Sequence, residues 1–289
     1  MKNHQSNTES QITAGSTPKT ALASERPARL LNGNADSSLL LVCEHASNYI
    51  PPQFNDLGID SALQSSHIAW DPGALAVANL LSKSLNAPVV ASAVSRLVYD
   101  CNRPPEAEDA IPTRSEIYDI PGNVSLTHGQ RTDRMQDFYL PFESLLANTL
   151  AGMPSRPSAP VLVTVHSFTP VYNGQRRTTE IGVLHDTDSR LADALLKLAP
   201  RHSSLIFRRN NPYGPSDGVT HTLKRHGVRN GLMNVMVEIR NDLITTADDQ
   251  RRMADMIAGL LVDALTRLMP GQRLKVGSVK RKGGPECQL

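Results

Sequence analysis

Short, uninterrupted apolar runs constrain the fold of this chain more than any other feature. Leu39–Cys43 and residues 161–165 are apolar at nearly every position. A strand buried on both faces of a sheet has this pattern, whereas a strand with one wet face alternates apolar and polar residues. The stretch that follows Asp71 repeats apolar residues at helical spacing as far as Leu85. Alternation of buried strands with helices predicts an α/β fold, with a mixed, mostly parallel sheet and helices on both faces.

The remaining elements follow from the same patterns and from capping signals. Further strands are predicted at residues 88–93, 181–184, 204–207 and 232–239. Further helices are predicted at 133–150 with a kink at Pro141, from Asp188 onward, at 219–226, and from 245 to Pro270. Residues 102–130 show little periodicity, and a segment of this length without regular structure predicts a functional loop such as a lid.

Both ends of the chain differ in composition from the middle. Residues 1–36 are rich in Ser, Thr, Asn and Ala without periodicity, which predicts a disordered arm. Residues 271–289 carry five basic side chains against Glu286, which predicts a flexible basic tail. A solvated tail is the simpler interpretation, and a weak contact with an anionic surface or RNA is the alternative. The 289-residue chain would then hold one catalytic α/β domain at residues 37–270.

Charge and cysteine content exclude several classes of protein. The formal net charge is +2, so the protein as a whole is not a typical nucleic-acid binder. Cys43, Cys101 and Cys287 are few, odd in number and far apart, which indicates a reducing compartment instead of a disulfide framework. We find neither an apolar run long enough to span a membrane nor a secretory signal, so we expect a cytoplasmic protein.

Polar residues with catalytic chemistry stand at or just beyond the apolar runs. They are Glu44-His45, Asp100-x-Asn102-Arg103, His166-Ser167 and Glu238. Open α/β sheets form their sites outside the strand ends, where separate loops converge. Two imidazoles, an isolated carboxylate and an Asn-Arg pair together suit a metal-dependent hydrolase whose small substrate carries a carboxylate.

His45 and His166 are the candidate ligands of a zinc ion. Each alone is more often a hydrogen-bonded structural residue, but two at strand ends could share one crevice. A catalytic zinc site takes three protein ligands and keeps a position open. Asp71 and Glu44 are both candidates for the third ligand. Asp71 would also serve as a helix N-cap before Pro72, and Glu44 is adjacent to His45, so only one of that pair points easily into one site.

Glu238 and Arg103 supply the remaining chemistry. Glu238 lies in an apolar run, where a carboxylate is costly to bury unless it is paired or used. It is either a general base with a raised pKa or the partner of an arginine such as Arg240. Arg103, with help from Asn102 and Arg96, would hold a substrate carboxylate bidentately. The alternative is a surface arginine beside a helix cap.

Several blocks of the sequence resemble those of a known enzyme family. The stretch Ser95-Arg96-Leu97-Val98-Tyr99-Asp100-Cys101-Asn102-Arg103-Pro104 resembles the SR-x(3)-D-x-NRP signature of the N-formylglutamate amidohydrolases. The other blocks occur in the same order, and they are Glu44-His45-Ala46-Ser47, His67 with Asp71, Val165-His166-Ser167-Phe168, Asn211-Pro212-Tyr213 and Val237-Glu238-Ile239-Arg240. The resemblance covers about residues 38–268. The Asp-x-Asn-Arg block is specific, whereas His-Ser alone is not.

The resemblance implies a fold similar to zinc carboxypeptidases and aspartoacylases, and a zinc-dependent deformylase or deacylase with one Zn²⁺ per chain. It implies His45 and His166 as ligands, Glu238 as the base and Arg103 as the carboxylate anchor. Carboxypeptidase-type relatives use His-x-x-Glu for two ligands, but here Asn48 stands three residues after His45. We therefore favour Asp71 as the third ligand, with Glu44 as the alternative.

The expected substrate is a small N-acyl amino acid with a carboxylate, such as N-formylglutamate. The sequence around His45 differs from the Pro-His-Ser-Gly form of the histidine-degradation enzyme, which indicates a divergent branch. The alternative function is a catalytically lapsed member that acts as an anion-binding or regulatory module. An intact Glu238 favours the enzyme. Self-association into a homo-oligomer is left open.

Overall fold

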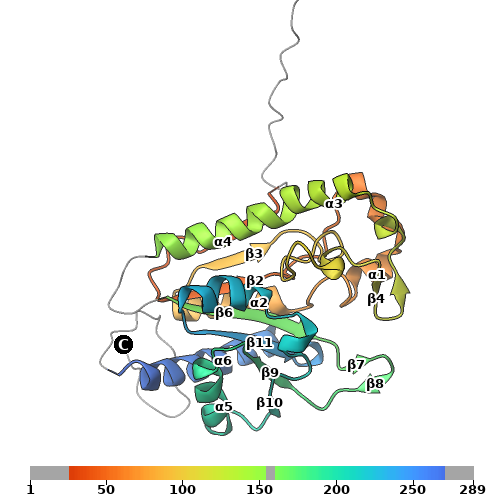
Figure 1. Cartoon of the computed structure of the whole chain (residues 1–289). Coiled ribbons are helices and arrows are strands. Elements are labelled where there is room, and N and C mark those ends of the chain that lie inside the picture. The colour runs from red at the N-terminus through yellow and green to blue at the C-terminus, as the bar shows by residue number, and fades with distance from the viewer. Residues whose placement is uncertain (1–25, 154–159, 271–289) are drawn as a thin grey trace, which may run out of the picture.

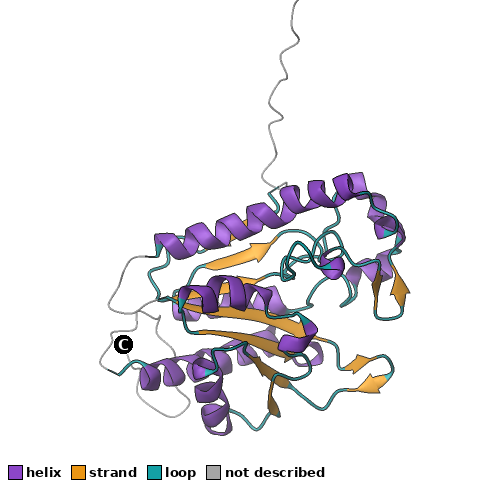
Figure 2. Ribbon diagram, in the orientation of Figure 1, coloured by secondary structure: helices purple, strands orange, loops and turns teal. Residues whose placement is uncertain are grey.

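The protein is described here by a computed structural model, which places residues 26–153 and 160–270. A seven-stranded sheet runs through the described part of the chain, with helices on both of its faces (Figures 1 and 2). The sheet strands are β1 (Ala28–Leu31), β2 (Leu39–Cys43), β3 (Val89–Ser92), β6 (Val161–Phe168), β9 (Ile181–Leu184), β10 (Phe207–Arg209) and β11 (Asn234–Arg240). The helices are α1 (Ser61–Ser65), α2 (Ala74–Leu85), α3 (His128–Arg134), α4 (Leu140–Gly152), α5 (Arg190–His202) and α6 (Ala247–Leu268).

The strand order in the sheet is β1-β3-β2-β6-β11-β9-β10. The neighbours β3-β2, β2-β6, β6-β11 and β9-β10 are parallel, whereas β1-β3 and β11-β9 are antiparallel. The predicted mixed, mostly parallel α/β sheet is thus confirmed. The chain leaves β2 toward β3 on one side and later enters β6 on the other, so β2 and β6 flank a topological switch point, where open α/β sheets place their sites.

Both faces of the central strands are packed, which explains why the strand sequences are apolar at consecutive positions. Leu39 and Leu41 of β2 belong to the core beneath α2, α5 and α6. Leu40 and Val42 of the same strand belong to the opposite core, which Phe142 of α4 helps to fill. Successive side chains of a strand point to opposite faces, so one run supplies both cores.

The structure corrects the predicted extent of the N-terminal arm. Residues 28–31 are part of the sheet, because β1 pairs antiparallel with β3 from Ala28–Ser92 to Leu31–Val89. A four-residue edge strand is too short to produce a clear periodicity, and Leu30 stays 41% exposed on it. Residues 1–25 and the predicted basic tail at 271–289 lie outside the described residues.

Two predicted helices begin elsewhere than the sequence indicated. α2 begins at Ala74 after an N-cap at Gly73 with φ 82°, so Asp71 is left outside the helix. The helix predicted from residue 133 begins at His128, where Thr127 and Gln130 form a capping box. A π-helical turn at Met135–Tyr139 joins α3 to α4 just before Pro141, in place of the predicted kink.

The predicted loop at 102–130 is packed and contains short elements of its own. They are the paired strands β4 (Arg114–Ser115) and β5 (Tyr118–Asp119), two short 3-10 turns and the first residues of α3. Ala110, Ile111 and Ile120 are fully buried in a third apolar cluster, beside Leu97 and Phe138. A second small hairpin, β7 (Val171–Tyr172) and β8 (Gln175–Arg176), follows β6. Within the described ranges, the structure contains no helix that is both long and apolar enough to cross a bilayer.

Candidate active site

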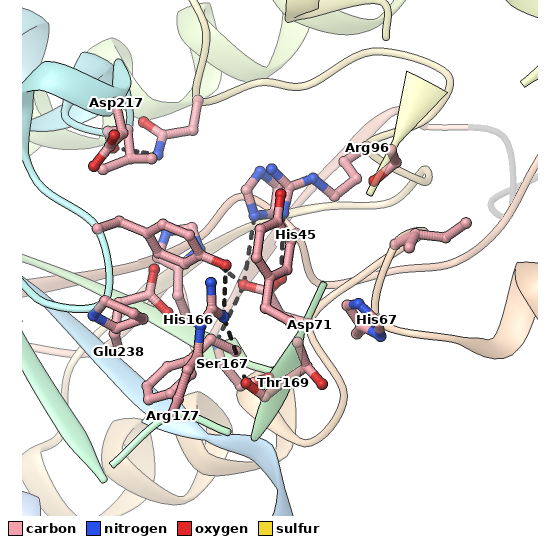
Figure 3. A pocket seen from close by; sticks show the side chains of 18 of the residues that line it. His45, His67, Asp71, Arg96, His166, Ser167, Thr169, Arg177, Asp217 and Glu238 are labelled. Carbon is pink, nitrogen blue, oxygen red and sulfur yellow. Dashed lines mark hydrogen bonds and ion pairs between the residues drawn. The ribbon is translucent and has the colours of Figure 1, made fainter. Parts of the chain in front are cut away.

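Three of the predicted site residues meet at the switch point between β2 and β6. His45 follows β2, Asp71 lies in the turn before α2, and His166 lies near the end of β6. One ligand-type atom from each of them lies within 4.8 Å of those from the others, and all three side chains are buried (Figure 3). The turn is joined to the β2 loop because the Asp71 backbone N–H donates to the His45 carbonyl oxygen, at 2.9 Å.

Each histidine of the cluster is held from behind by a carboxylate. His45 Nε2 lies 2.7 Å from Asp100 Oδ1, and His166 Nε2 forms an ion pair with Glu44 Oε2 at 3.0 Å. These contacts leave the Nδ1 atom of each ring on the side of Asp71. Metal-binding histidines in proteins commonly have this arrangement, in which a carboxylate on one ring nitrogen orients the other nitrogen toward the ion.

The same geometry separates the two candidates for the third ligand. Asp71 Oδ2 lies 2.9 Å from His166 Nδ1 and 3.4 Å from His45 Nδ1, between the two rings. It also accepts a hydrogen bond from the Ser167 backbone N–H at 3.2 Å. Glu44, by contrast, contacts the far nitrogen of His166. Asp71 therefore belongs to the cluster, and Glu44 supports it.

The electrostatics of the cluster follow from burying carboxylates against imidazoles. Burial opposes a charge on Asp71, but His45 and His166 hold its pKa well below the usual range. Burial also opposes protonation of His166, yet Glu44 and Asp71 raise its pKa well above its ordinary value. For His45, Asp100 and Asp71 outweigh burial and the Arg96 charge and raise its pKa. The cluster thus favours a positive charge at its centre.

The residues present fit a divalent metal ion. His45 Nδ1 is buried and makes no hydrogen bond within the described part of the chain, although it lies 3.4 Å from Asp71 Oδ2. A buried polar nitrogen without a partner is costly. Two imidazole nitrogens and one carboxylate oxygen form a donor set of the kind that catalytic zinc sites use.

Glu238 lies beside this cluster on β11. It pairs in register with His166 of β6, so both side chains project from the same side of the sheet. The residue is 5% exposed, and its Oε2 atom has no hydrogen-bond partner in the described ranges. Burial raises the pKa of Glu238 to about 7, and the Asp71 charge adds to the effect. The alternative that Glu238 pairs with Arg240 is not what the structure shows, because Arg240 pairs with Glu180 and Asp242.

A cavity of about 450 Å³ opens above the cluster, and the predicted substrate residues line it. Arg96 forms ion pairs with Asp100 at 2.9 Å and with Asp71 at 3.7 Å. Arg103 Nε pairs with Asp109 at 2.7 Å, and Asp109 is 59% exposed. Arg96 is therefore a fixed part of the carboxylate network, whereas Arg103 pairs with a carboxylate that water screens.

Asn102 connects two segments of the cavity wall. Its Nδ2 donates to the Val219 carbonyl oxygen at 2.6 Å, and its Oδ1 accepts from the Thr222 backbone N–H at 3.0 Å. Arg103 Nη1 donates to the neighbouring Gly218 carbonyl oxygen at 3.2 Å. The Asn-Arg pair thus fixes the 218–222 segment next to the cavity, in addition to any contact with a substrate.

Sequence reasoning missed several residues of the site. Asp100 stands inside the quoted signature, but nothing in the sequence assigned it to His45. Tyr213 stands in the quoted Asn-Pro-Tyr block without a role. Arg177, after β8, also lines the cavity, and no pattern in its short hairpin marks it.

Comparisons with known proteins agree with this site. The family model for N-formylglutamate amidohydrolase matches residues 37–245. A gene product from Agrobacterium tumefaciens with a solved crystal structure is 50% identical, over 85% of this chain and 97% of that chain, with a TM-score of 0.82. The crystal structure of an N-formylglutamate amidohydrolase from Ralstonia eutropha has a related fold, at 16% identity over 84% of this chain and 98% of that chain, with a TM-score of 0.54.

A comparison with curated proteins found no match. The family match indicates a hydrolase of the amidohydrolase type. It spans both histidines, the Asp-x-Asn-Arg block and Glu238, and the resemblance seen in the sequence rests on those same blocks. The chain belongs to the N-formylglutamate amidohydrolase family.

Proposed function

We propose that this protein is a zinc-dependent amidohydrolase that removes a formyl-type acyl group from a small, carboxylate-bearing N-acyl amino acid such as N-formylglutamate. One observation carries the proposal. Two histidines, each held by a carboxylate, converge on Asp71 next to Glu238, a buried residue whose Oε2 atom lacks a hydrogen-bond partner among the described residues. A protein that only binds an anion has no need of such a group.

His45, Asp71 and His166 would hold one Zn²⁺ per chain. These three ligands leave a fourth position for water or substrate. When bound there, the ion would supply Lewis-acid chemistry, which polarises the carbonyl group of the scissile amide. Asp100 and Glu44 would keep each ring in the orientation that presents Nδ1 to the cluster.

Glu238 would move the proton in this reaction. Its pKa of about 7 lets it accept a proton from the attacking water near neutral pH and return that proton to the leaving amine. The low exposure of the residue keeps bulk water from competing for the same proton.

Arg103 would anchor the substrate carboxylate, with Arg96 and Asn102 in support. Arg103 can exchange its exposed partner Asp109 for a substrate carboxylate at little cost, because solvent already weakens that ion pair. Arg96 adds positive potential from its fixed place beside Asp71. Asn102 would act mainly by holding the cavity wall at Val219. A cytoplasmic location is part of the same proposal.

Metal analysis together with a substrate panel tests this function. We expect about one zinc per chain in the purified protein, and release of formate from N-formyl amino acids that carry a carboxylate. His166→Ala should lose both zinc and activity. Activity that persists after zinc is removed by a chelator would contradict the mechanism. A zinc-loaded protein that cleaves no N-acyl amino acid would contradict the substrate class.

A further inference from the structure

An arginine that the sequence did not single out lies within a cage of aromatic rings at the cavity. Arg177 follows β8, and its Cζ atom lies 4.5 Å from the ring centre of Tyr172, 4.7 Å from that of Tyr213 and 5.6 Å from that of Phe168. All four residues line the cavity that contains His166 and Glu238. Figure 3 labels Arg177 together with these two residues. Aromatic faces stabilise a guanidinium group without neutralising its charge.

The hydrogen bonds of Arg177 fix its guanidinium group and leave one edge unused. Nη1 donates to the Tyr213 hydroxyl at 2.9 Å and to the Thr169 carbonyl oxygen at 3.4 Å. In the part of the chain that the structure describes, Nε and Nη2 donate to no acceptor. The Nε–Nη2 edge is one of the two planar forks with which arginine binds a carboxylate through two parallel hydrogen bonds.

Arg177 also differs from the other two arginines of the cavity in its charge environment. Arg96 pairs with Asp100 and Arg103 pairs with Asp109, whereas no carboxylate of the described residues lies within 4.0 Å of Arg177. Its positive charge is therefore not engaged in an ion pair with any acid of the described residues. A held, partly buried and unbalanced guanidinium in a substrate cavity is suited to an anion that arrives with the substrate.

Tyr213 links this arginine to the reacting end of the cavity. Burial and the nearby Glu238 carboxylate raise the pKa of Tyr213, so its hydroxyl stays protonated while it accepts from Arg177. Arg177 and Tyr213 line the same cavity as the His45-Asp71-His166 cluster, so an anion that Arg177 binds there would share the cavity with that cluster.

We propose that Arg177 is a specificity-determining residue, which binds the side-chain carboxylate of the N-acyl amino acid through its Nε–Nη2 edge. The inference rests on the proposed function, in which Arg103 holds the other carboxylate of the same substrate. Arg177 then selects acidic N-acyl amino acids over neutral ones of the same size.

A pair of substrates that differ only in this charge tests the role. N-formylglutamate and N-formylglutamine share every group except the side-chain carboxylate. For the zinc-loaded wild type we expect a clear preference in kcat/KM for N-formylglutamate. Arg177→Met should reduce kcat/KM for N-formylglutamate by about 10- to 100-fold, the usual range for a charge-assisted hydrogen-bonded pair, and change it little for N-formylglutamine.

The matched control is Arg176→Met, because Arg176 is the preceding residue and is exposed on β8. This variant should keep the wild-type preference. Equal losses on both substrates in Arg177→Met would overturn the proposal, because they would mean that Arg177 acts on the scissile group or on the fold. An unchanged preference would overturn it as well.

A second readout has the opposite sign and cannot come from misfolding. With the guanidinium removed, the cavity keeps the rings of Phe168, Tyr172 and Tyr213, so Arg177→Met should cleave N-formylmethionine better relative to N-formylglutamate than the wild type does. If the wild type cleaves no N-formyl amino acid, the proposed function is wrong. Calorimetric titration of the zinc-loaded proteins with N-formylglutamate and N-formylglutamine then tests Arg177 separately, because the wild type should bind the acid more tightly than the amide and Arg177→Met should not.

Discussion

Glu238 and His166 stand side by side, in register on the parallel strands β11 and β6. On its other side Glu238 faces Gly182 of the antiparallel strand β9, which has no side chain to place there. The backbone of Glu238 is therefore positioned by the sheet itself and not by a loop. The pairing of β11 with β6 and β9 keeps the Glu238 backbone beside that of His166.

Glu238→Gln should separate metal binding from proton transfer. The amide keeps the shape of the side chain but cannot accept the proton, so we expect unchanged zinc content with kcat lower by about 10²- to 10⁴-fold. Zinc per chain and steady-state kinetics on N-formylglutamate measure the two effects. Turnover close to wild type would show that Glu238 is a structural residue.

The raised pKa of Glu238 also predicts how the stability of the metal-free protein depends on pH. Its pKa rises from an ordinary 4.5 to about 7 on folding, so the folded state holds the proton more tightly than the unfolded state. Below about pH 4.5 Glu238 is protonated in both states, and its raised pKa does not affect the free energy of unfolding. Between pH 4.5 and pH 7 the raised pKa lowers the free energy of unfolding progressively, by at most about 3 kcal/mol.

Glu238→Gln removes this cost, so the zinc-free variant should be more stable than the zinc-free wild type at pH 8, with a smaller advantage at pH 5. Urea unfolding of both proteins at the two pH values gives the difference, in which the contributions of the other titrating groups largely cancel. An advantage that grows toward low pH would mean that the sign is wrong.

Asp71 and Glu44 should differ in what their loss does to the metal. We expect Asp71→Asn to abolish tight zinc binding, because it replaces the proposed ligand between the two rings. Glu44→Gln removes the carboxylate behind His166 and should weaken zinc binding by about 10- to 100-fold. Competition with a chromogenic chelator measures both affinities. A stronger effect at Glu44 than at Asp71 would reverse the assignment.

The support behind His45 gives a similar test with a matched control. Asp100→Asn weakens the acceptor at His45 Nε2, so zinc affinity should fall by about 10- to 100-fold. Asp109→Asn also removes one acidic charge beside a cavity arginine, but it contacts Arg103 and not the cluster. Its zinc affinity should stay as in the wild type. Equal losses in both variants would indicate a general charge effect.

The sequence predicts the parts of this molecule that depend on local pattern. Apolar runs such as Leu39–Cys43 predict buried strands because consecutive side chains of such a strand pack into apolar cores on opposite faces of the sheet. The edge strand at Ala28–Leu31 was missed because a short strand with one exposed side carries almost no pattern. Asp71 could be read as a helix cap from its neighbours, whereas in the structure it contacts His166, 95 residues away.

The contacts that orient the two histidines and complete the rings around Arg177 join segments far apart in the sequence. Asp100 reaches His45 across 55 residues, and the rings around Arg177 come from segments on either side of it. Residue type alone shows that a histidine could bind a metal. The carboxylate that orients the histidine depends on which loops the sheet order brings together, and that order is not encoded in any one segment.

Gly182 provides the last prediction, because the sheet leaves no room for a side chain beside Glu238, the proposed base. A Cβ atom at this position would clash with the Asn211 carbonyl oxygen and would lie 3.0 Å from Glu238 Cβ. Gly182→Ala should therefore lower the free energy of unfolding by about 1–3 kcal/mol, the usual cost of overpacking, and lower kcat by displacing Glu238. Urea unfolding and kinetics on N-formylglutamate measure both effects.

Gly152→Ala is the control, since a Cβ there meets no atom of the described residues within 4 Å. Both the free energy of unfolding and kcat should stay near wild type in this variant. If Gly182→Ala keeps full kcat, the position of Glu238 does not depend on close packing against β9, and the sheet does not hold Glu238 in the way we describe.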